Sequence, residues 1–509
     1  MARNATLALL LVAGAARADL CSDVMARIGD RLAPGASCVP SADLTTNNPA
    51  TTPPNNSLAF PPFAFTPQTD RATIVPSPAR RPPVLVKVPG VQIDAALAAD
   101  STGEARFLLR LPENWNGKLV VAGASGTRSE FNGDFAWSDY VLQQGYAYAS
   151  QNKGVLNFHL TDPDPALAAP GKPSDPLACR LAPFPPAFAN FWVHFYDNDP
   201  QKPFWEWQFR IVEAAAIARE GVRAAYGKSP KRTYAVGTSN GGYQVRRAIE
   251  LAPGLFDGGV DWEGTFVDGE TFNLLTDLPP AVKNFPLYLA SGYDPNNAAA
   301  KNIEAAGYPP DIVVRNSAGN VTASLWQTNF FAFWEVTLCQ WQKRLDPGYD
   351  TYRLGLGLGP GNYDYFARTE VSDVQDNLEA FANTGRIKAP LITVAGTMDA
   401  LLPIKHHARA YADKVAEARR GDEDDEEEEH GHPAYRLYEV QNGNHIETYK
   451  DTVSDKLELI QPHARKAFDL LVDFVEKGKP LPPDQCIPRG GAIARAPAQA
   501  GRCEKLLER

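Results

Sequence analysis

The sequence predicts an α/β fold in which a mostly parallel β-sheet is covered by helices on both faces. Short apolar runs alternate with segments of helical periodicity, which is the pattern of parallel strands joined by helical crossovers. The run at 389–399 is nearly continuous in apolar residues, as a strand buried on both faces requires. A chain of 509 residues is long enough for one large domain with an insertion, or for two domains.

Most of the expected elements follow residue 105. Strands are expected at 107–111, 119–122, 145–154, 233–236, 285–294, 389–399 and 435–445. Helices are expected at 209–227, directly after residue 239, and at 463–478. Residues 39–95 are rich in Pro, Asn and Thr and are predicted to form an extended, irregular arm.

An aromatic-rich region interrupts this alternation and is interpreted as a lid inserted into the core. The predicted organisation is a signal peptide at 1–18, a Pro-rich arm at 19–104, a core at 105–295 and 386–485, the lid at 296–385, and a tail at 486–509. We find no internal repeat.

The N-terminus is typical of a secretory signal peptide. Arg3 is followed by an apolar stretch, Leu7–Ala16, which is too short to span a bilayer. The sequence Ala16-Arg17-Ala18 fits a small-x-small cleavage site, so we expect cleavage after Ala18 and a secreted or periplasmic protein. No other segment is long and apolar enough to predict a membrane span.

Export favours disulfides among the six cysteines. The economical pairing is Cys21–Cys38, Cys486–Cys503 and Cys179–Cys339, although six cysteines allow 15 connectivities. None of the cysteines has CxxC spacing, so no zinc site is expected.

The charge balance is acidic. A net charge of −10 argues against nucleic acid or an anionic membrane as a partner. Eight of the acidic residues form one run at 422–429, which we expect to be a solvated loop because adjacent carboxylates repel one another.

The stretch Gly237-Thr238-Ser239-Asn240-Gly241 matches the G-x-S-x-G pattern of a nucleophile on a sharp strand-to-helix turn. The glycines are needed because a side chain at either position would collide with the neighbouring strand or helix. A strand is predicted before this stretch and a helix after it. Ser239 is therefore the candidate nucleophile of an α/β-hydrolase fold, and a structural turn with a capping serine is the alternative.

An acid and a histidine follow in the order that this fold requires. Asp399 ends the strand at 389–399, and the residues after it form a loop that would turn its carboxylate inward. His445 is the last residue of the segment at 435–445, directly after a run of Asn and Gly that follows its apolar part. Asp294 is the alternative acid, since it ends the segment predicted as the strand at 285–294.

A serine nucleophile also needs an oxyanion hole of two backbone N–H groups. One donor is expected at Asn240, directly after the nucleophile. The other is expected at Ala124 or Ser125, in the loop after the strand at 119–122.

The chain contains, in this order, the motifs LPENWNGKLVVAGASG, GYAYASQNKG, GTSNGGYQ, LFDGGV, AGTMDALLP and LVDFVEKGKPLPP. Together they resemble the tannase and feruloyl esterase family of secreted serine esterases. The resemblance implies an α/β-hydrolase fold with a large lid between nucleophile and acid. It also implies catalytic roles for Ser239, Asp399 and His445, and aromatic-acid esters of the feruloyl or galloyl type as substrates. No cofactor or metal is expected.

The sequence departs from that family at two positions. The family typically has a disulfide between cysteines beside the serine and the histidine, where this chain has Thr238 and Ile446.

The segment GKPLPPDQCIPRGG at 478–491 is also similar to hydroxybutyrate oligomer hydrolases. Hydrolysis of 3-hydroxybutyrate oligomers or related polyesters is therefore the alternative function.

Two further classes remain open. A serine peptidase of the same fold would use the same triad, and Asp261 and Glu263 could bind its substrate's amine, although loop hydrogen bonding is the favoured role for both. A non-enzymatic binding protein is disfavoured by three triad residues in the right order at strand ends.

The lid is expected to select the substrate. Trp326, Trp334 and Trp341 are the candidate substrate-binding residues, because one or two of them facing Ser239 would form a flat, apolar acyl site. The alternative is that they form the lid's own core.

Overall fold

The structure is a computed structural model that describes residues 19–48, 75–126, 129–155, 158–159, 179–180, 192–193, 202–349, 362–423 and 432–508. The expected signal peptide and residues 424–429 of the acidic run lie outside these described residues.

The centre of the molecule is a large sheet whose strand order identifies the fold. Its main strands, in spatial order, are β2 (Gly90–Ala96), β3 (Arg106–Pro112), β5 (Ala147–Gln151), β4 (Lys118–Ala122), β9 (Arg232–Thr238), β10 (Gly258–Trp262), β13 (Leu391–Gly396) and β14 (Tyr435–Val440). β3 is antiparallel to both of its neighbours, whereas all pairs from β5 to β14 are parallel. This is the strand order of the α/β-hydrolase fold, so the predicted fold class is confirmed.

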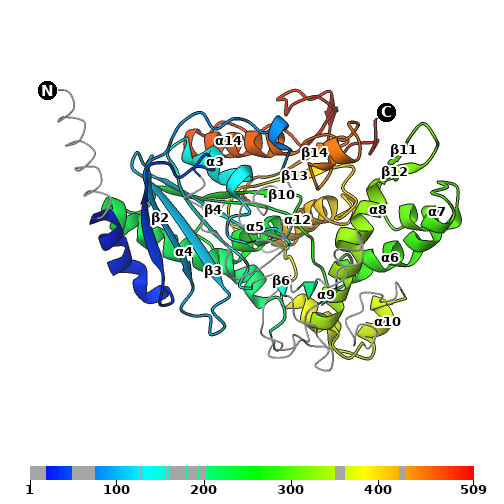
Figure 1. Ribbon diagram of the computed structural model, residues 1–509, viewed down its shortest axis with the longest axis horizontal. Helices are drawn as coiled ribbons and strands as arrows, with labels where there is room; N and C mark the ends of the chain where they lie inside the picture. The colour runs from blue at the N-terminus through cyan, green and yellow to red at the C-terminus, as the bar shows by residue number, and fades with distance from the viewer. Residues whose placement is uncertain are drawn as a thin grey trace.

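Helices cover both faces of the sheet, and a separate hydrophobic core lies under each set. One core is shared by α4 (Trp205–Tyr226), α5 (Asn240–Leu251) and α12 (Ala408–Glu423), and the other includes α3 (Asp139–Leu142) and α14 (Gln461–Lys477). In Figure 1, α3 and α14 lie above the strands and α4 lies below them. The strands are thus buried on both faces, which explains their apolar sequences.

The expectation of an irregular arm is wrong for part of the N-terminal region. β1 (Ser37–Ser41) pairs with β2, and β2 pairs with β3 along its full length. In β2, Val91, Ile93 and Ala95 alternate into the core beneath α4. The alternation is present in the sequence, but the Pro-rich surroundings obscured it.

The predicted strand at 285–294 is also wrong, because most of this segment belongs to helix α6 (Leu274–Ala290). The apolar run continues a helical spacing of buried residues through Leu278, Val282 and Phe285. This periodicity is visible only when the preceding residues are included. The core strand after β9 is instead β10, whose paired glycines gave a weak strand signal.

The insertion between β10 and β13 therefore begins before residue 296. Its described elements are α6, α7 (Ala298–Ala305), β11 (Val313–Arg315), β12 (Val321–Ser324), α8 (Leu325–Asn329), the π-helical turn η6 (Phe330–Trp334), α9 (Glu335–Leu345), α10 (Tyr365–Thr369) and α11 (Val374–Glu379). Figure 1 shows them together in green and yellow beside the sheet.

The three expected disulfides are present in the structure. They join Cys21 to Cys38, Cys179 to Cys339, and Cys486 to Cys503. Cys339 lies in α9, so the second bridge ties the lid to β7 (Cys179–Arg180). The predicted pairing is confirmed.

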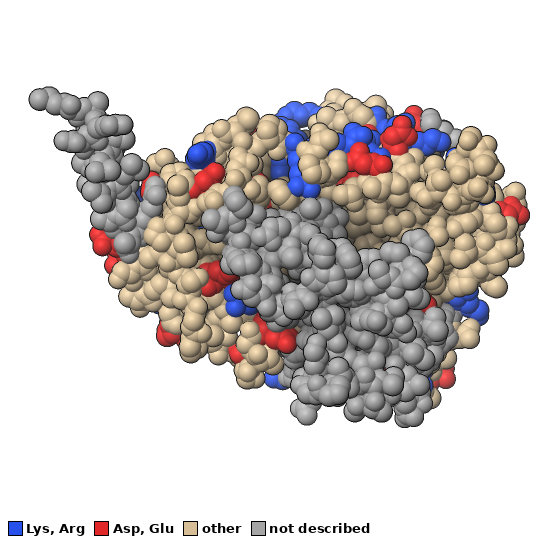
Figure 2. Space-filling model, in the orientation of Figure 1, with Lys and Arg blue, Asp and Glu red and all other residues tan. Residues whose placement is uncertain are grey.

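The described surface carries both signs of charge. On the face in Figure 2, Lys and Arg are interspersed with Asp and Glu, most densely along the upper edge. A search of the described residues finds no helix with the length and apolarity to cross a bilayer.

Glu335 makes the stability of the lid depend on pH. Its side chain is buried in α9, and burial raises the pKa of this carboxyl to about 8. The unfolded chain ionises near pH 4.5, so the folded state is progressively penalised as pH rises from about 4.5 through 8. We expect Glu335→Gln to raise the free energy of unfolding at pH 9 by about 2–4 kcal/mol, with little change near pH 4.

Urea unfolding at both pH values measures this difference. The matched control is Glu370→Gln, the same change at an exposed lid position, which should have no pH-dependent effect. A benefit of equal size at pH 4 and pH 9 would contradict the ionisation argument.

Candidate active site

Ser239 occupies a strained turn between β9 and α5. Its backbone has φ 60° and ψ −124°, a conformation that non-glycine residues rarely adopt. Its N–H donates to the carbonyl of Trp262 at 2.9 Å, which fixes the turn against the neighbouring strand. This is the geometry of a nucleophile elbow, in which strain holds the serine at the end of its strand.

The glycines of the motif are required by close backbone contacts. A Cβ at Gly237 would lie 2.2 Å from the carbonyl oxygen of Gly241. A Cβ at Gly241 would lie 2.6 Å from the carbonyl oxygen of Gly123, in the loop after β4. Both distances are far below van der Waals contact, so the expected steric reason for the glycines is confirmed.

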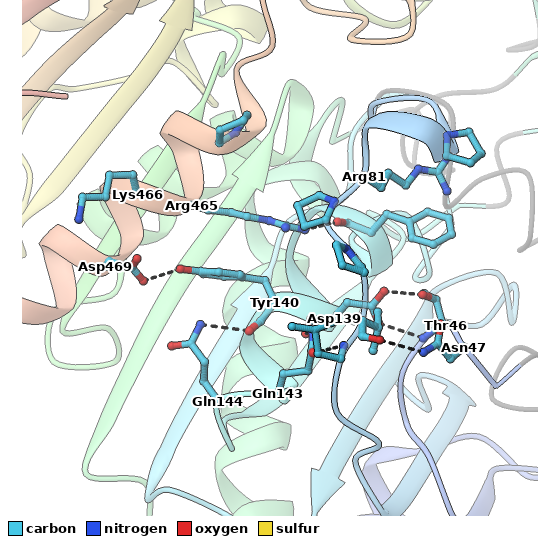
Figure 3. A pocket seen from close by; sticks show the side chains of 17 residues that line it. Thr46, Asn47, Arg81, Asp139, Tyr140, Gln143, Gln144, Arg465, Lys466 and Asp469 are labelled. Atoms are coloured by element: carbon cyan, nitrogen blue, oxygen red, sulfur yellow. Dashed lines mark hydrogen bonds between the residues drawn. The ribbon is translucent and has the colours of Figure 1, made fainter. Parts of the chain in front are cut away.

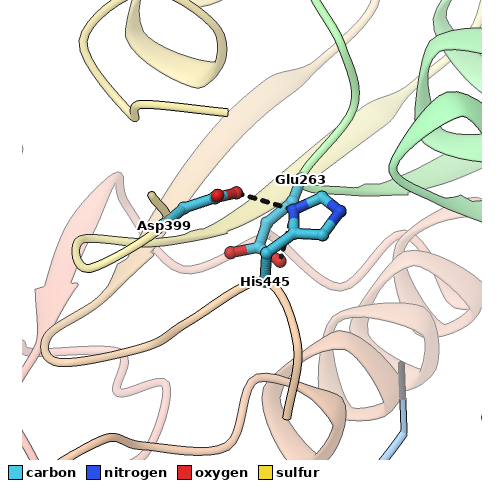
Figure 4. A group of neighbouring side chains, drawn as sticks. All are labelled: Glu263, Asp399 and His445. Atoms are coloured by element: carbon cyan, nitrogen blue, oxygen red, sulfur yellow. Dashed lines mark hydrogen bonds and ion pairs between the residues drawn. The ribbon is translucent and has the colours of Figure 1, made fainter. Parts of the chain in front are cut away.

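Asp399 and His445 form a direct hydrogen bond. The Nδ1 atom of His445 lies 2.7 Å from Oδ2 of Asp399 (Figure 4), and both side chains are buried. The other carboxylate oxygen, Oδ1, accepts from the backbone N–H groups of Leu401 and Leu402 at 2.8 and 2.7 Å. The loop after β13 therefore turns the carboxylate inward and supplies two backbone donors to this oxygen.

The sheet brings Ser239 to the same edge as this pair. Ser239 follows β9, Asp399 follows β13 and His445 follows β14, and these strands are parallel. Their carboxyl ends therefore lie along one edge. This is the arrangement in which a hydrolase of this fold assembles a nucleophile, an acid and a base.

The expected oxyanion donors lie beside this edge, but two of them have internal partners. The N–H of Ala124 donates to Oε1 of Gln244 at 2.9 Å, and the N–H of Ser125 donates to Oδ1 of Asn132 at 3.1 Å. Asn240 is the first residue of α5, where backbone N–H groups have no partner within the helix.

A second carboxyl group lies beside the imidazole of His445. Oε2 of Glu263 is 3.6 Å from Nδ1 of His445, and Glu263 lies directly after β10 (Figure 4). Burial raises the pKa of Glu263 well above its ordinary value, and the charge of Asp399 raises it further. Sequence reasoning assigned Glu263 only an amine-binding or a loop role; its place directly after a strand was the signal that could have found it.

These three side chains are the group of possible metal ligands found among the described residues, with ligand atoms within 4.8 Å of one another. The 2.7 Å separation of Asp399 and His445 is shorter than the roughly 3.3 Å that separates two ligands of a tetrahedral ion bound at 2.0 Å. The geometry therefore fits a shared proton better than a shared ion.

The alternative acid and the proposed amine anchor fit the structure poorly. Asp294 is exposed and caps a turn after α6, where its carboxylate accepts from the N–H of Asn296. Asp261 is fully buried and forms an ion pair with Arg246 at 2.6 Å. Neither acid presents a free carboxylate at the edge that holds His445.

The three lid tryptophans are packed inside the protein. Trp326, Trp334 and Trp341 are each exposed by 1% or less. The indole of Trp326 donates to Pro309 within the lid, and that of Trp334 donates to the carbonyl of Ala400 at 2.8 Å. Trp326 and Trp334 pack against other lid aromatics, as in the alternative interpretation of a lid core. Trp341 instead packs against Phe204 and Trp207, at the start of α4. Trp334 also connects the lid to the residue after Asp399.

We therefore expect Trp334→Phe to act through the fold and not through substrate choice. The change removes the donor to the buried carbonyl of Ala400, at a cost of about 1–2 kcal/mol. The kcat/KM values for a small acetate ester and a larger acyl ester should change by the same factor, within about threefold. Trp326→Phe, which loses a donor inside the lid, is the matched control for stability. A selective loss on the larger ester would place Trp334 against the substrate.

A separate open pocket of about 740 Å³ lies on the α3 and α14 side of the sheet. Figure 3 shows the side chains of Arg81, Tyr140, Arg465 and Asp469 around it. Arg465 donates to backbone carbonyls, and Tyr140 donates to Asp469 at 2.6 Å. Arg465, Tyr140 and Asp469 thus bind other groups of the protein itself.

Comparison with known sequences supports one of the expected resemblances. Residues 343–502 match the family model of 3HB-oligomer hydrolases. The D-(-)-3-hydroxybutyrate oligomer hydrolases of Burkholderia vietnamiensis and Burkholderia thailandensis are both 33% identical to this chain, over 132 and 129 residues. These alignments cover 25% and 24% of this chain, but only 18% and 17% of the relatives. The region that matches the family model includes Asp399 and His445 but not Ser239.

Solved structures with overall similarity include feruloyl esterase B from Aspergillus oryzae, at 12% identity and a TM-score of 0.49, covering 90% of this chain and 91% of that one. Tannin acyl hydrolase from Aspergillus niger has 12% identity and a TM-score of 0.44, covering 91% and 88%. The two groups that the sequence resembles are the tannase and feruloyl esterase family and the hydroxybutyrate oligomer hydrolases. Members of both are thus found among the similar proteins. Because these TM-scores are below 0.5, the fold assignment rests on the strand order described above.

Proposed function

We propose that the protein is a serine hydrolase of carboxylic esters that works through an acyl-enzyme. The observation that carries this proposal is the 2.7 Å hydrogen bond between His445 and Asp399, at the sheet edge where Ser239 occupies its strained turn. A buried acid–imidazole pair beside a serine elbow supplies the general base that the serine hydroxyl needs.

The proposed reaction has two steps. His445 takes the proton of the Ser239 hydroxyl, and the oxygen attacks the ester carbonyl to form a tetrahedral intermediate. His445 then gives this proton to the leaving alcohol, which leaves an acyl group on Ser239. Water repeats the sequence and releases the acid. Asp399 stabilises the imidazolium throughout, because its other oxygen is already held by two N–H groups.

The oxyanion is assigned to the N–H of Asn240 and one donor from the loop after β4. Ala124 and Ser125 are the candidates for the second donor, but their N–H groups are bound to Gln244 and Asn132. The proposal therefore includes a rotation of one of these amide side chains when substrate binds. Rotation of Gln244 would break both hydrogen bonds that its Oε1 accepts, from the N–H of Ala124 and from Nε2 of Gln151. In return the freed N–H gains a bond to a charged oxygen, which is stronger than a bond between neutral groups.

For the substrate, we propose 3-hydroxybutyrate oligomers or related short polyesters. The sequence match to 3HB-oligomer hydrolases supports this class and includes Asp399 and His445. The aromatic-acid esters implied by the other resemblance have weaker support, since the tryptophans expected to bind a ring are buried in the lid. A peptidase role also has weaker support, because Asp261, one of the two acids that could bind an amine, is paired with Arg246.

A substrate panel tests both the proposed ester hydrolysis and the proposed class of substrate. It contains a 3-hydroxybutyrate trimer, methyl ferulate, a gallate ester, a terephthalate ester, p-nitrophenyl acetate and an aminoacyl p-nitroanilide. We expect the trimer to have the highest kcat/KM among the esters, by about tenfold or more, and no cleavage of the anilide. A higher value for methyl ferulate would overturn the substrate class, and failure to cleave any ester would overturn the function.

We also propose that the protein is exported. The three disulfides support this, because such bonds persist mainly in oxidising compartments. Thiol titration of the denatured, unreduced protein should find no free thiol, and a count of two or more would contradict the proposal.

A further inference from the structure

We propose that Glu263 is a positioning residue for His445, a second carboxyl partner at Nδ1 that can replace Asp399 as the acceptor of the imidazole proton. This inference rests on the proposed function, because it assigns a role within the same site. It rests on the juxtaposition of one imidazole nitrogen with two buried carboxyl groups from different strands.

The two carboxyl groups approach His445 at different distances. Asp399 makes the hydrogen bond at 2.7 Å, whereas Oε2 of Glu263 is 3.6 Å from the same nitrogen. A separation of 3.6 Å is too long for a hydrogen bond, so Asp399 is the working acceptor. A movement of about 0.7 Å would bring Glu263 to an ordinary N–H···O length. Rotation of a side chain can supply such a movement without a change of fold.

The backbone around Glu263 is built to hold its carboxyl group in this place. Oε1 accepts from the N–H of Gly396 at 2.9 Å, and Oε2 accepts from the indole of Trp262 at 3.2 Å. Its own N–H donates to the carbonyl of Val394 at 2.9 Å. Glu263 also has φ 51°, a strained value for a residue with a side chain. Strain of this kind persists only where the surroundings enforce it, and it is concentrated at functional sites.

The charges around Glu263 explain why it can be a reserve acceptor. The titratable groups around it are Asp399, His445 and Glu447. Burial is the main cause that raises the pKa of Glu263, and the charge of Asp399 raises it further, with a smaller contribution from Glu447. Beside the charge of Asp399, burial favours the neutral form of Glu263, which leaves Asp399 as the negative partner of the imidazolium. If Asp399 loses its charge, this repulsion disappears and the ionised form of Glu263 becomes less costly. Glu263 can then accept from Nδ1 and keep the tautomer that leaves Nε2 free to act as the base.

The experiment compares Asp399→Asn, Glu263→Gln and the double variant in kcat and KM. We expect a fall in kcat of about 10²-fold for Asp399→Asn, which is less than the roughly 10⁴-fold loss typical of a triad without a second acid. Glu263→Gln alone should cost less than about tenfold, since it keeps the shape of the neutral acid. The double variant should lose about 10⁴-fold or more, beyond the product of the single effects, with KM changed little.

Glu447→Gln is the matched control. This buried glutamate lies near Glu263, but its Oε1 accepts from the N–H of Gln461 at 2.5 Å. It has the same chemistry and burial without the contact to Nδ1. In the Asp399→Asn background, Glu447→Gln should change kcat by less than about threefold, which separates contact with His445 from a general effect of removing a nearby acid.

Proton NMR gives a readout that does not need turnover. The strongly deshielded Nδ1–H signal of an imidazole bound to a carboxylate should persist in Asp399→Asn and disappear in the double variant, with both proteins folded by circular dichroism. The inference is overturned if Asp399→Asn is as inactive as Ser239→Ala, or if the double variant matches Asp399→Asn in rate and spectrum. An inactive wild-type protein would instead overturn the proposed function, and the NMR comparison would still decide the role of Glu263.

Discussion

Replacement of Ser239 by alanine is expected to lower kcat for ester hydrolysis by about 10⁴-fold or more, because the hydroxyl that forms the acyl-enzyme is lost. The fold should be unaffected. Alanine fits the same strained turn, since the turn is held by the backbone bond to Trp262 and by the glycine contacts around it. Initial rates on p-nitrophenyl acetate, with thermal unfolding as the check on folding, measure both effects.

Asp294→Asn is the control for removal of an acid elsewhere. Asp294 is exposed on the lid, so its replacement should leave kcat within about twofold. A greater loss for Asp294→Asn than for Asp399→Asn would transfer the acid role to Asp294. Residual activity of Ser239→Ala within about tenfold of wild type would show that the nucleophile lies elsewhere.

The features of the candidate site that could be predicted from the sequence are those that depend on local patterns. Ser239, Asp399 and His445 each follow a strand with a strong apolar signal, and each lies in a short loop with small residues. In a parallel sheet the ends of such strands must lie along one edge, so their order along the chain already predicted that they gather. Gly237 and Gly241 likewise indicated, from the motif alone, two positions where the backbone is in close contact with its neighbours.

The parts that were missed depend on contacts between distant segments. Whether Ala124 and Ser125 have free N–H groups is decided by the amides of Gln244 and Asn132, which no spacing rule connects to them. Glu263 became significant only when β10 was recognised as a core strand, because its place beside His445 follows from strand order. A strand with two glycines and a charged residue has too little apolar character to be detected alone.

The structure of the lid also depends on packing contacts that the sequence alone does not reveal. A segment such as 285–294 is compatible with a buried strand or a buried helix, and only packing decides between them. From the sequence alone, the tryptophans of the lid could equally have faced the substrate or the interior of the protein. Packing also connects the lid to the site, because the carboxylate of Asp277 on α6 lies 2.9 Å from His406 and 3.3 Å from His407, a few residues after Asp399. A change in the lid core is therefore expected to reach the loop that carries the acid.

Replacement of Asp261 by alanine is expected to cost about 3–5 kcal/mol of stability, because it leaves the guanidinium of Arg246 buried without its charge partner. Both side chains are fully buried, and the Nε atom of Arg246 donates to Oδ2 of Asp261 at 2.6 Å. The other oxygen of Asp261 accepts from the N–H of Gly264, and the two bonds fix the turn that carries Glu263. The loss should therefore appear in the free energy of unfolding in urea, together with a lower kcat.

A second variant separates the buried charge from the lost contacts. Arg246→Met combined with Asp261→Ala removes both charges and should recover about half or more of the lost stability, since a buried ion pair can often be replaced by apolar groups at little cost. Glu304→Ala is the matched surface control, because its pair with Lys301 is partly exposed and should contribute less than about 1 kcal/mol. If Asp261→Ala were as mild as Glu304→Ala, the pair would not be holding the turn beneath the site. The geometry of Glu263 would then depend on its bonds to Gly396, Trp262 and Val394.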